Sequence, residues 1–282
     1  MIVFFTRSAQ HLVEKINVPK AHFIIKQFSD GELYVRIDEN VQHKEIWIIA
    51  STEPPAENLL ELYFLLDALV RLGVQKINLF FSYFGYARQA KALPGEAGSA
   101  QLICDILKKF PLNKIYCMHA HAAPLLHTFL NFTNIIPMSF FCFVAKNYDI
   151  VAAPDKGAFE FAQNVSKVCG KELVLLKKMR PEHEKVRIES IDGAVEGKKV
   201  LLIDDMISTG GTLIEACQAL MNLGAAEISA AATHGIFSPG AYERLEESSL
   251  KKIYVTNTLT RLSKGKIEVS DIGMLIESII TQ

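Results

Sequence analysis

The segment Val200–Thr212 (Val-Leu-Leu-Ile-Asp-Asp-Met-Ile-Ser-Thr-Gly-Gly-Thr) limits the possible fold more than any other part of the chain. Its first four residues are apolar and predict a strand that is buried on both faces, as strands of parallel sheets are. Two carboxylates end this strand, and a loop of small residues leads into a helix predicted at Thr212–Leu223. Because parallel strands require crossover connections, the segment indicates an α/β fold.

The same loop has the composition of an anion site. Its two glycines allow unusual backbone dihedrals and let backbone N–H groups approach a ligand closely. Those groups lie at a helix N-terminus, where the partial positive charge favours phosphate, and two threonines add hydroxyl donors. The two carboxylates stand where sugar hydroxyls or a Mg²⁺ would bind. If the small residues served packing alone, these two adjacent carboxylates would have no cation or hydroxyl to satisfy them. The segment thus predicts a site for a phosphorylated sugar, formed by Asp204, Asp205, Thr209, Gly210, Gly211 and Thr212.

Composition limits the class of protein. The chain has 282 residues, 50% of them hydrophobic, enough for two domains with a core each. A formal net charge of −1 argues against nucleic acid and against a membrane surface as partners. No apolar run approaches the roughly 20 residues of a membrane span. The N-terminus reaches Thr6 and Arg7 too soon for a signal peptide, and five scattered cysteines without a CxxC pair predict reduced thiols. We therefore expect a soluble cytoplasmic protein.

Predicted strands and helices alternate along the whole chain. Strands are predicted at Ile2–Phe5, Glu45–Ala50, Lys76–Phe81, Lys114–Cys117, Ile150–Ala153, Leu173–Lys177, Lys199–Asp204, Glu227–Thr233 and Lys252–Thr256. Further helices are predicted at Ala56–Leu72, Ser99–Phe110, Gly157–Cys169 and Ala241–Glu247. This alternation predicts two similar doubly wound domains with parallel sheets, residues 1–140 and 141–282. An internal echo supports the doubling, because Ala68–Phe81 and Leu220–Thr233 share a helix end, Leu-Gly and a strand.

Two long polar segments interrupt the alternation, Gln89–Gly98 and Lys178–Glu196. Both follow predicted strands, and irregular segments of this length in a compact enzyme are usually lids or binding loops. Lys177, Lys178 and Arg180 stand at the start of the second segment. A charge run of this kind is normally a solvated surface, but this one follows a strand of the same sheet as the Val200–Thr212 segment.

Other motifs also follow predicted strands. Phe28–Arg36 reads as a hairpin with an Asp-Gly turn. Arg88 can bridge phosphate oxygens and Gln89 can pair with a base edge, although an isolated loop arginine is more often a solvated charge. The motif Tyr116–His121 predicts two imidazoles on one face, His119 and His121, for a metal or a polyphosphate.

The last strand-end motif is Ala153–Ala158, with the same strand, turn and helix order as Val200–Thr212. Its Asp155 suits either a helix N-cap or a ligand for sugar hydroxyls.

In chain order, these motifs resemble those of the ribose-phosphate pyrophosphokinase family over nearly the whole chain, from Ile2 to Ile280. The six segments are Phe28–Arg36, Ser82–Gln89, Tyr116–His121, Ala153–Ala158, Leu176–Arg180 and Val200–Thr212. The compact length and the Ala-Pro-Asp-Lys-Gly-Ala stretch look more like the archaeal-type branch than the longer, allosterically controlled one.

The resemblance implies two phosphoribosyltransferase-like domains, the first with ATP-binding motifs and the second with the ribose-5-phosphate loop and a catalytic flexible loop. It implies Mg²⁺-dependent transfer of the diphosphoryl group of ATP to the 1-hydroxyl of ribose 5-phosphate, giving 5-phosphoribosyl 1-diphosphate and AMP. It also implies a homo-oligomer built from dimers, because the hairpin contributes to the adenine pocket of a neighbouring subunit.

The implied roles fall on residues of this chain that match the family's motifs. ATP would be bound by Phe28, Asp30, Glu32, Arg88, Gln89 and His121. Ribose 5-phosphate would be bound by Asp204, Asp205, Ser208, Thr209, Gly210, Gly211 and Thr212. The catalytic cations would be Lys178 and Arg180, and the metal contacts His121 and Asp155.

Three positions depart from the family's pattern, since Ala90, His119 and Ser208 stand where it usually has aspartate. Two alternatives stay open: a phosphoribosyltransferase, because the element of strand, Asp-Asp, loop and helix is shared with that class, and a non-catalytic regulatory homologue of the synthetase. The doubled layout and the motifs around Phe28 and Arg88 count against the first. The second leaves Lys178, Arg180, His121, Asp204 and Asp205 without a physical reason to be present together.

Overall fold

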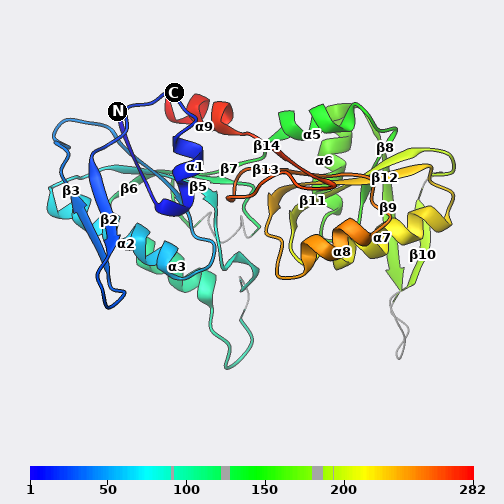
Figure 1. Ribbon diagram of the computed structural model, residues 1–282, viewed down its shortest axis with the longest axis horizontal. Coiled ribbons are helices and arrows are strands. Elements are labelled where there is room, and N and C mark those ends of the chain that lie inside the picture. Colours follow the sequence, from blue (N-terminus) through cyan, green and yellow to red (C-terminus); the bar gives the residue numbers. More distant parts are fainter. Residues whose placement is uncertain (90–91, 122–127, 180–186, 193) are drawn as a thin grey trace. The chain divides into compact units, whose positions relative to one another are not determined.

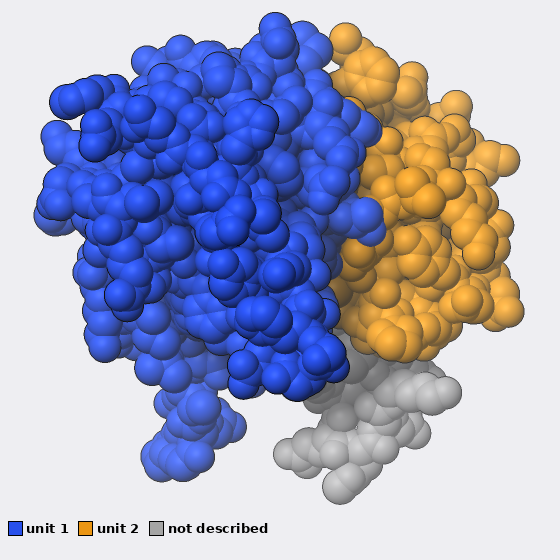
Figure 2. All heavy atoms as spheres, turned by 60° about the vertical axis from the view of Figure 1, so that its left-hand side comes forward, with its two compact units in different colours: residues 1–136, 258–260, 272–282 blue, residues 137–257, 261–271 orange. Residues whose placement is uncertain are grey.

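The computed structural model describes residues 1–89, 92–121, 128–179, 187–192 and 194–282, with residues 177–179 and 187–192 described by their backbone alone (Figure 1). The chain divides into two compact units, coloured separately in Figure 2. Unit 1 contains residues 1–136, 258–260 and 272–282, and unit 2 contains residues 137–257 and 261–271.

Unit 1 is built on a five-stranded parallel sheet with the order β1-β4-β5-β6-β7. Its strands are β1 (Ile2–Phe5), β4 (Ile46–Ser51), β5 (Ile77–Tyr83), β6 (Leu112–Met118) and β7 (Phe132–Ile135). Successive side chains point to opposite faces of a strand. In β4, Ile46 and Ile48 therefore join the core on one face, whereas Trp47 and Ile49 join the core on the other.

Helices cover both faces of this sheet. On one face lie α2 (Glu57–Arg71) and α3 (Ser99–Leu107), and α2 buries Leu62, Leu65 and Leu69 at helical spacing. The other face is covered by the 3₁₀ turn η1 (Arg7–Ala9), by α1 (Gln10–Val13) and by the C-terminal helix α9 (Gly273–Ile280). Both faces of the sheet are therefore dry, as its continuous apolar strands predict.

The hairpin predicted around Phe28 is confirmed. Strand β2 (Phe23–Gln27) pairs antiparallel with β3 (Leu33–Ile37), from Phe23 opposite Ile37 to Gln27 opposite Leu33. Phe23, Val35 and Ile37 pack against the core on the side of α2. This leaves the turn at Phe28 to project beyond the packed part of the hairpin (Figure 1).

Unit 2 contains a seven-stranded sheet with the order β10-β9-β8-β11-β12-β13-β14, parallel except for β10, which runs antiparallel to β9. The strands are β8 (Ile150–Ala153), β9 (Glu172–Met179), β10 (Arg187–Asp192), β11 (Lys199–Ile207), β12 (Glu227–Gly235), β13 (Ile253–Thr256) and β14 (Ile267–Ser270). The chain runs outward from β8 through β9 to β10 and then returns to β11, on the other side of β8. The strand order therefore reverses between β8 and β11.

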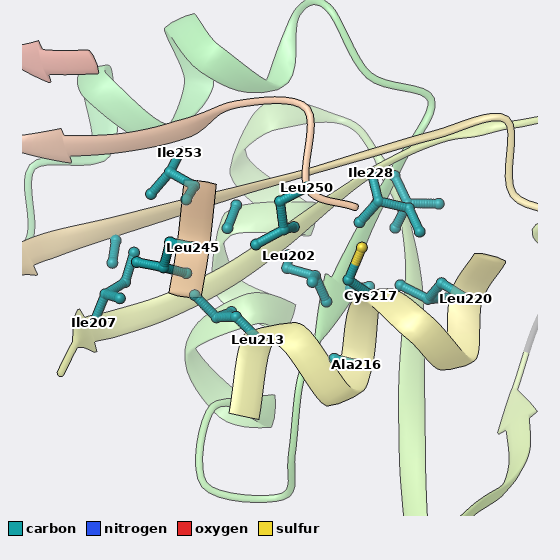
Figure 3. Packing of buried hydrophobic residues seen from close by; sticks show 14 of the residues in the cluster. Leu202, Ile207, Leu213, Ala216, Cys217, Leu220, Ile228, Leu245, Leu250 and Ile253 are labelled. Carbon is teal, nitrogen blue, oxygen red and sulfur yellow. The ribbon is translucent and has the colours of Figure 1, made fainter. Parts of the chain in front are cut away.

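Two layers of helices cover the unit 2 sheet. Helices α5 (Met138–Ala145) and α6 (Phe159–Cys169) pack on one face, and α7 (Gly211–Asn222) and α8 (Ala241–Glu247) on the other. Figure 3 shows Leu213 and Leu220 of α7 and Leu245 of α8 packed beneath the strands, against Leu202 and Ile228.

The predicted doubly wound fold with two parallel sheets is confirmed, and each of the nine predicted strands is present. The compact units do not coincide with the predicted ranges 1–140 and 141–282, since residues 137–140 belong to unit 2 and residues 258–260 to unit 1. Residues 272–282 belong to unit 1, because Ile276 and Ile280 of α9 are buried there with Val3 and Trp47. Within the described residues, no helix combines the length and apolar character needed to cross a bilayer.

Two further expectations are wrong. The segment Lys178–Glu196 is not wholly irregular, since Lys178 and Met179 continue β9 and Arg187–Asp192 forms β10. The cysteines are not all reduced, since Cys142 of α5 and Cys169 at the end of α6 form a disulfide. The spacing of these two cysteines in the sequence did not indicate the bond, which depends on the packing of α5 beside α6.

Candidate active site

The point where the strand order of unit 2 reverses lies between β8 and β11. In open α/β sheets, ligands bind beyond the carboxyl ends of the strands at such a point. Asp155 follows the end of β8, and Asp204 lies two residues after Leu202, which is in register with Ala152 of β8. Asp155, just after β8, and Asp204, in the carboxyl half of β11, therefore lie at the same edge of the sheet.

We call Ser208–Thr212 the phosphate loop. It connects β11 to α7, and Gly210 at the N-cap of α7 has a left-handed backbone with φ of 79°. A Cβ at Gly210 would lie 2.7 Å from Cδ2 of Leu245, so glycine is required there for conformation and for space. Gly211 is not in the left-handed region, and its N–H donates to Oγ1 of Thr209 at 3.4 Å. The loop thus presents a helix N-terminus, as predicted.

Three carboxylates crowd this edge. Burial, the neighbouring charge of Asp205 and the charge of Asp155 together raise the pKa of Asp204 to about 8, although the N–H of Asp205 donates to Asp204 Oδ1 at 2.8 Å. Asp155 Oδ1 accepts the N–H of Ala158 at 3.1 Å, but the N-cap of α6 is Ala158 itself, so Asp155 is not the predicted N-cap. The excess of negative charge favours a cation or a hydroxyl donor at this edge.

A hydrated Mg²⁺ fits this donor set better than a metal held by protein alone. Among the described residues, no three or more His, Cys, Asp or Glu side chains converge closely enough to hold a metal ion. Mg²⁺ usually keeps several waters and takes one or two carboxylates together with substrate phosphates. Asp155 belongs to unit 2 and His121 to unit 1, so the two predicted metal contacts lie in different units.

In unit 1, Arg88 and Gln89 lie beyond the carboxyl end of β5, in the 3₁₀ turn η2 (Ala87–Gln89), and both are exposed. The turn is fixed against the end of β4, because Thr52 Oγ1 accepts the N–H of Gly85 at 2.8 Å. A Cβ at Gly85 would lie only 2.1 Å from the carbonyl oxygen of Thr52. This contact was not predicted from the sequence. The sign that could have indicated it is Gly85, a glycine just after a buried strand.

The histidines after β6 do not share a face. His119 is 6% exposed and has a positive φ of 38°, whereas His121 is exposed. The strand ends at Met118, so the two-residue period behind the prediction no longer applies. The N–H of Ala120 donates to Asn134 Oδ1 at 2.8 Å, which fixes the backbone just before His121.

The hairpin tip carries the predicted adenine contacts. Phe28 is 47% exposed, and its ring lies 5.4 Å from that of Tyr34. Lys26 Nζ lies 5.5 Å from the centre of the Phe28 ring. Asp30 Oδ1 accepts the N–H of Glu32 at 3.1 Å, which shapes the turn.

Of the predicted catalytic cations, Lys178 lies in β9 with its backbone in register with Ile188 of β10. Arg180 lies outside the described residues, as does Ala90.

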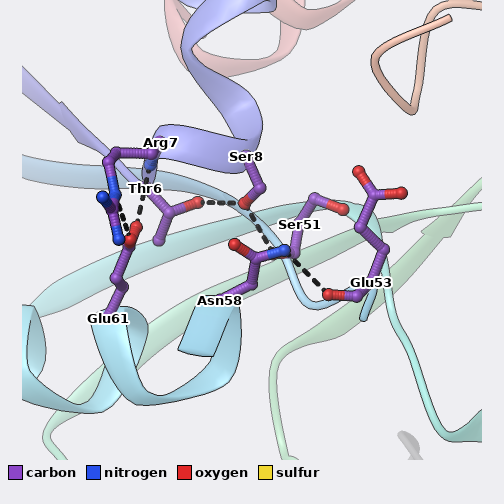
Figure 4. A network of polar contacts seen from close by, with 7 residues as sticks. All are labelled: Thr6, Arg7, Ser8, Ser51, Glu53, Asn58 and Glu61. Atoms are coloured by element: carbon purple, nitrogen blue, oxygen red, sulfur yellow. Dashed lines mark hydrogen bonds and ion pairs between the residues drawn. The ribbon is translucent and has the colours of Figure 1, made fainter. Parts of the chain in front are cut away.

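A buried polar network in unit 1 was not predicted (Figure 4). Glu61 of α2 has no exposed surface, accepts the N–H of Arg7 at 3.0 Å and forms an ion pair with the Arg7 side chain. Ser8 Oγ donates to the carbonyl of Ser51 at 2.8 Å. The network joins the carboxyl ends of β1 and β4. The sequence did not single out Glu61 as a functional or buried polar residue, because it lies in an apolar run of α2.

The structure therefore brings the predicted residues together in separate groups. Arg88, Gln89 and His121 follow neighbouring parallel strands of unit 1. Asp155, Asp204, Asp205 and the phosphate loop meet at the edge of unit 2. The hairpin tip of unit 1 forms a third group.

Both units match known domain families. Residues 3–110 match the N-terminal domain of ribose phosphate pyrophosphokinase, and residues 137–273 match the phosphoribosyl transferase domain. The ribose-phosphate pyrophosphokinase of Fusobacterium nucleatum is 33% identical, over 92% of this chain and 85% of the relative. That of Chlorobaculum tepidum is 37% identical, over 90% of this chain and 82% of the relative.

A solved structure agrees over the whole length. Phosphoribosylpyrophosphate synthetase from Mycobacterium smegmatis is 28% identical with a TM-score of 0.88, and the match covers 99% of this chain and 97% of that one. The fold, both domain matches and the identity to the bacterial relatives agree, and the chain belongs to the ribose-phosphate pyrophosphokinase family.

Proposed function

We propose that the chain binds ribose 5-phosphate at the phosphate loop of unit 2 and ATP at the carboxyl edge of unit 1. The protein is a ribose-phosphate diphosphokinase that makes 5-phosphoribosyl 1-diphosphate and AMP from ATP and ribose 5-phosphate. The observation that carries the assignment of the sugar is the left-handed Gly210 at the N-terminus of α7, beside the crowded carboxylates of Asp204 and Asp205.

In this proposal the 5-phosphate is bound by the backbone N–H groups and hydroxyls of the loop. The residues concerned are Ser208, Thr209, Gly210, Gly211 and Thr212. Asp204 and Asp205 accept hydrogen bonds from the ring hydroxyls, which would relieve the crowding that raises the pKa of Asp204. Asp155 and His121 are the proposed contacts of Mg²⁺, which would neutralise part of the negative charge of the triphosphate.

ATP is proposed to lie against Arg88, Gln89 and His121, where the guanidinium can bridge two phosphate oxygens. The adenine ring is proposed to meet Phe28, Asp30 and Glu32 of a neighbouring subunit. The partial exposure of the Phe28 ring supports this role, since a base needs accessible aromatic surface for stacking. The same assignment requires an oligomer, which we propose to be a homo-oligomer built from dimers.

The chemical step forms a bond between the 1-hydroxyl oxygen of the sugar and the β-phosphorus of ATP. The bond from that phosphorus to the α–β bridging oxygen breaks, AMP leaves with the bonding electrons, and its phosphate takes up the hydroxyl proton, which reaches solvent when the products leave. Negative charge grows on the bridging oxygen, and Lys178 and Arg180 are proposed to stabilise it once the site has closed and lost its water. Exclusion of water also protects ATP from hydrolysis.

An assay for AMP release tests the function directly. We expect AMP from ATP only when ribose 5-phosphate and Mg²⁺ are present, with one 5-phosphoribosyl 1-diphosphate formed per AMP. A phosphoribosyltransferase would instead consume that diphosphate in the presence of a base. A non-catalytic regulatory homologue would show neither reaction, and either result would overturn the proposal.

The shared adenine pocket is tested by mixing two variants. Phe28→Ala and Arg88→Ala are each expected to lose most activity with ATP. If the residues meet across subunits, mixed oligomers contain some sites with both native residues, and activity returns on mixing. No recovery after subunit exchange, shown by native mass spectrometry, would place both residues around the base within one subunit.

The archaeal-type branch remains part of the proposal, on the compact length and the Ala153–Ala158 motif. It predicts that ADP competes only at the ATP site, as inhibition kinetics would show. The cytoplasm is the proposed compartment, in keeping with the protein's nucleotide substrate.

A further inference from the structure

Three residues outside the phosphate loop hold it in place, and sequence reasoning assigned a role to none of them. Ser238 Oγ lies 2.8 Å from Ser208 Oγ, and its N–H donates to the Ser208 carbonyl at 3.0 Å. Leu245 of α8 fills the space beside Gly210. All three lie in or just before α8, which thus forms the support of the loop.

The third residue is Arg244, whose contact is the most directional. Its Nε donates to the carbonyl oxygen of Thr209 at 3.3 Å, and its Nη2 donates to the same oxygen at 3.2 Å. Gly240 leaves room for this side chain, since a Cβ there would lie 3.0 Å from Arg244 Nη1. Two donors on one planar guanidinium define the direction of the carbonyl more strictly than a single donor could.

This contact also determines the direction of an N–H group in the loop. The peptide between Thr209 and Gly210 is trans and planar, so its C=O and N–H point in opposite directions. Because Arg244 holds the carbonyl toward α8, the N–H of Gly210 points away from α8. It therefore joins the N–H groups at the start of α7 that are proposed to meet the 5-phosphate.

Such an anchor is needed because glycine adopts positive and negative φ with similar ease. Without it, the Thr209–Gly210 peptide could rotate and present its carbonyl oxygen, which carries partial negative charge, to the phosphate. We propose that Arg244 is a positioning residue for ribose 5-phosphate: it fixes the Thr209–Gly210 peptide so that an N–H group, and not a carbonyl, faces the 5-phosphate. This inference rests on the proposed binding of ribose 5-phosphate at the phosphate loop.

The test compares Arg244→Met with the wild-type protein. Methionine keeps much of the side chain's apolar contact but has no donor. We expect equilibrium binding of ribose 5-phosphate, measured by calorimetry without ATP, to weaken about tenfold, the scale of a hydrogen bond from a charged donor. KM for ribose 5-phosphate should rise in proportion, and KM for ATP should stay unchanged. Arg244→Lys keeps the charge and one directed donor, so its affinity for ribose 5-phosphate should lie between those of the wild type and Arg244→Met.

Arg71 provides a matched control, since it is an exposed helical arginine of unit 1 paired with Asp67. Arg71→Met should change neither binding constant. Thermal melting establishes that each variant is folded. If Arg244→Met does not fold, Ser238→Ala removes the neighbouring tether to Ser208 and should weaken ribose 5-phosphate binding by about threefold, as loss of one neutral hydrogen bond would.

Two outcomes would overturn the inference while leaving the proposed function intact. One is wild-type affinity for ribose 5-phosphate in Arg244→Met. The other is an equal rise of both KM values, which would indicate a general loss of structure. Failure of the wild-type protein itself to bind ribose 5-phosphate or release AMP would instead contradict the proposed function.

Discussion

The side chain of Leu245 occupies the place that a Cβ on Gly210 would need, 2.7 Å from its Cδ2. Helix α8, which packs on the same face of the unit 2 sheet as α7, thereby restricts the residue at which the phosphate loop leads into α7. The contact and the positive φ together exclude a side chain at this position.

Gly210→Ala should raise KM for ribose 5-phosphate by about tenfold or more, because alanine at positive φ costs roughly 1 kcal/mol and must also displace Leu245. Steady-state kinetics measure the effect. Gly170→Ala is the matched control, since Gly170 has φ of 65° with nothing within 4 Å of an added Cβ. It should lower the melting temperature without changing KM. Equal kinetic effects of both changes would contradict a local role for Gly210.

Lys178→Ala should lower kcat by about 10²-fold or more, the usual effect of losing one preorganised donor to a developing charge. KM values should change much less, because the negative charge that develops on the bridging oxygen is absent from the bound substrates. Lys177→Ala, next to it in β9, serves as the comparison, and we expect it to stay within a few-fold of wild type. Near-normal turnover in Lys178→Ala would remove this lysine from the mechanism.

The unliganded protein should lose stability as the pH rises from about 4 to about 8. Asp204 ionises near 3.8 when unfolded, but burial and the charges of Asp205 and Asp155 raise its pKa to about 8 in the fold. Between these values the folded state keeps a proton that the unfolded state has lost, so the free energy of unfolding falls with pH.

Asp204→Asn should abolish this dependence. Its free energy of unfolding should match that of the wild type near pH 4 and exceed it at pH 8 by on the order of 2 kcal/mol. The melting temperature should rise accordingly at pH 8. Differential scanning calorimetry across this range gives the measurement, and Asp149→Asn provides an exposed-aspartate control. A constant difference between variant and wild type at all pH values would contradict the raised pKa.

The non-reduced, denatured protein should react with a thiol reagent at three cysteines, and the reduced protein at all five. The three free thiols are Cys104, Cys117 and Cys217, and the bonded pair is Cys142–Cys169. Closing a loop of this length, with a sequence separation of 27, should stabilise the fold by about 3 kcal/mol. Five reactive thiols without reductant would show that the bond does not form.

The sequence pattern was sufficient to predict an element where the spacing of its apolar residues matched the faces that the element buries. The apolar strand before Asp204 has both faces covered, so four consecutive apolar residues marked it clearly. The leucine period of α2 and the Asp-Gly turn of the hairpin were equally direct. The phosphate loop was predictable because its glycine, hydroxyl and carboxylate residues are adjacent in the chain.

Features that depend on distant contacts were not predictable. Helix α5 (Met-Ser-Phe-Phe-Cys-Phe-Val-Ala) is apolar almost throughout and shows no period, and β10 is polar and becomes a strand only by pairing with β9. The left-handed backbone at His119 broke the alternation expected of a strand end. The clamp from Arg244 to Thr209 joins residues 35 positions apart, which no local motif reveals.

The burial of α9 in unit 1 has a consequence for synthesis on the ribosome. Residues 1–136 are made before residues 272–282, so Val3, Leu12 and Trp47 lack the cover of Ile276 and Ile280 until α9 has emerged. Unit 2, whose segments end at residue 271, has all its own strands before that moment. Unit 1 is therefore completed after unit 2, although residues 1–136 are made earlier, and a nascent chain stalled before Ile272 would carry an apolar face open to chaperones.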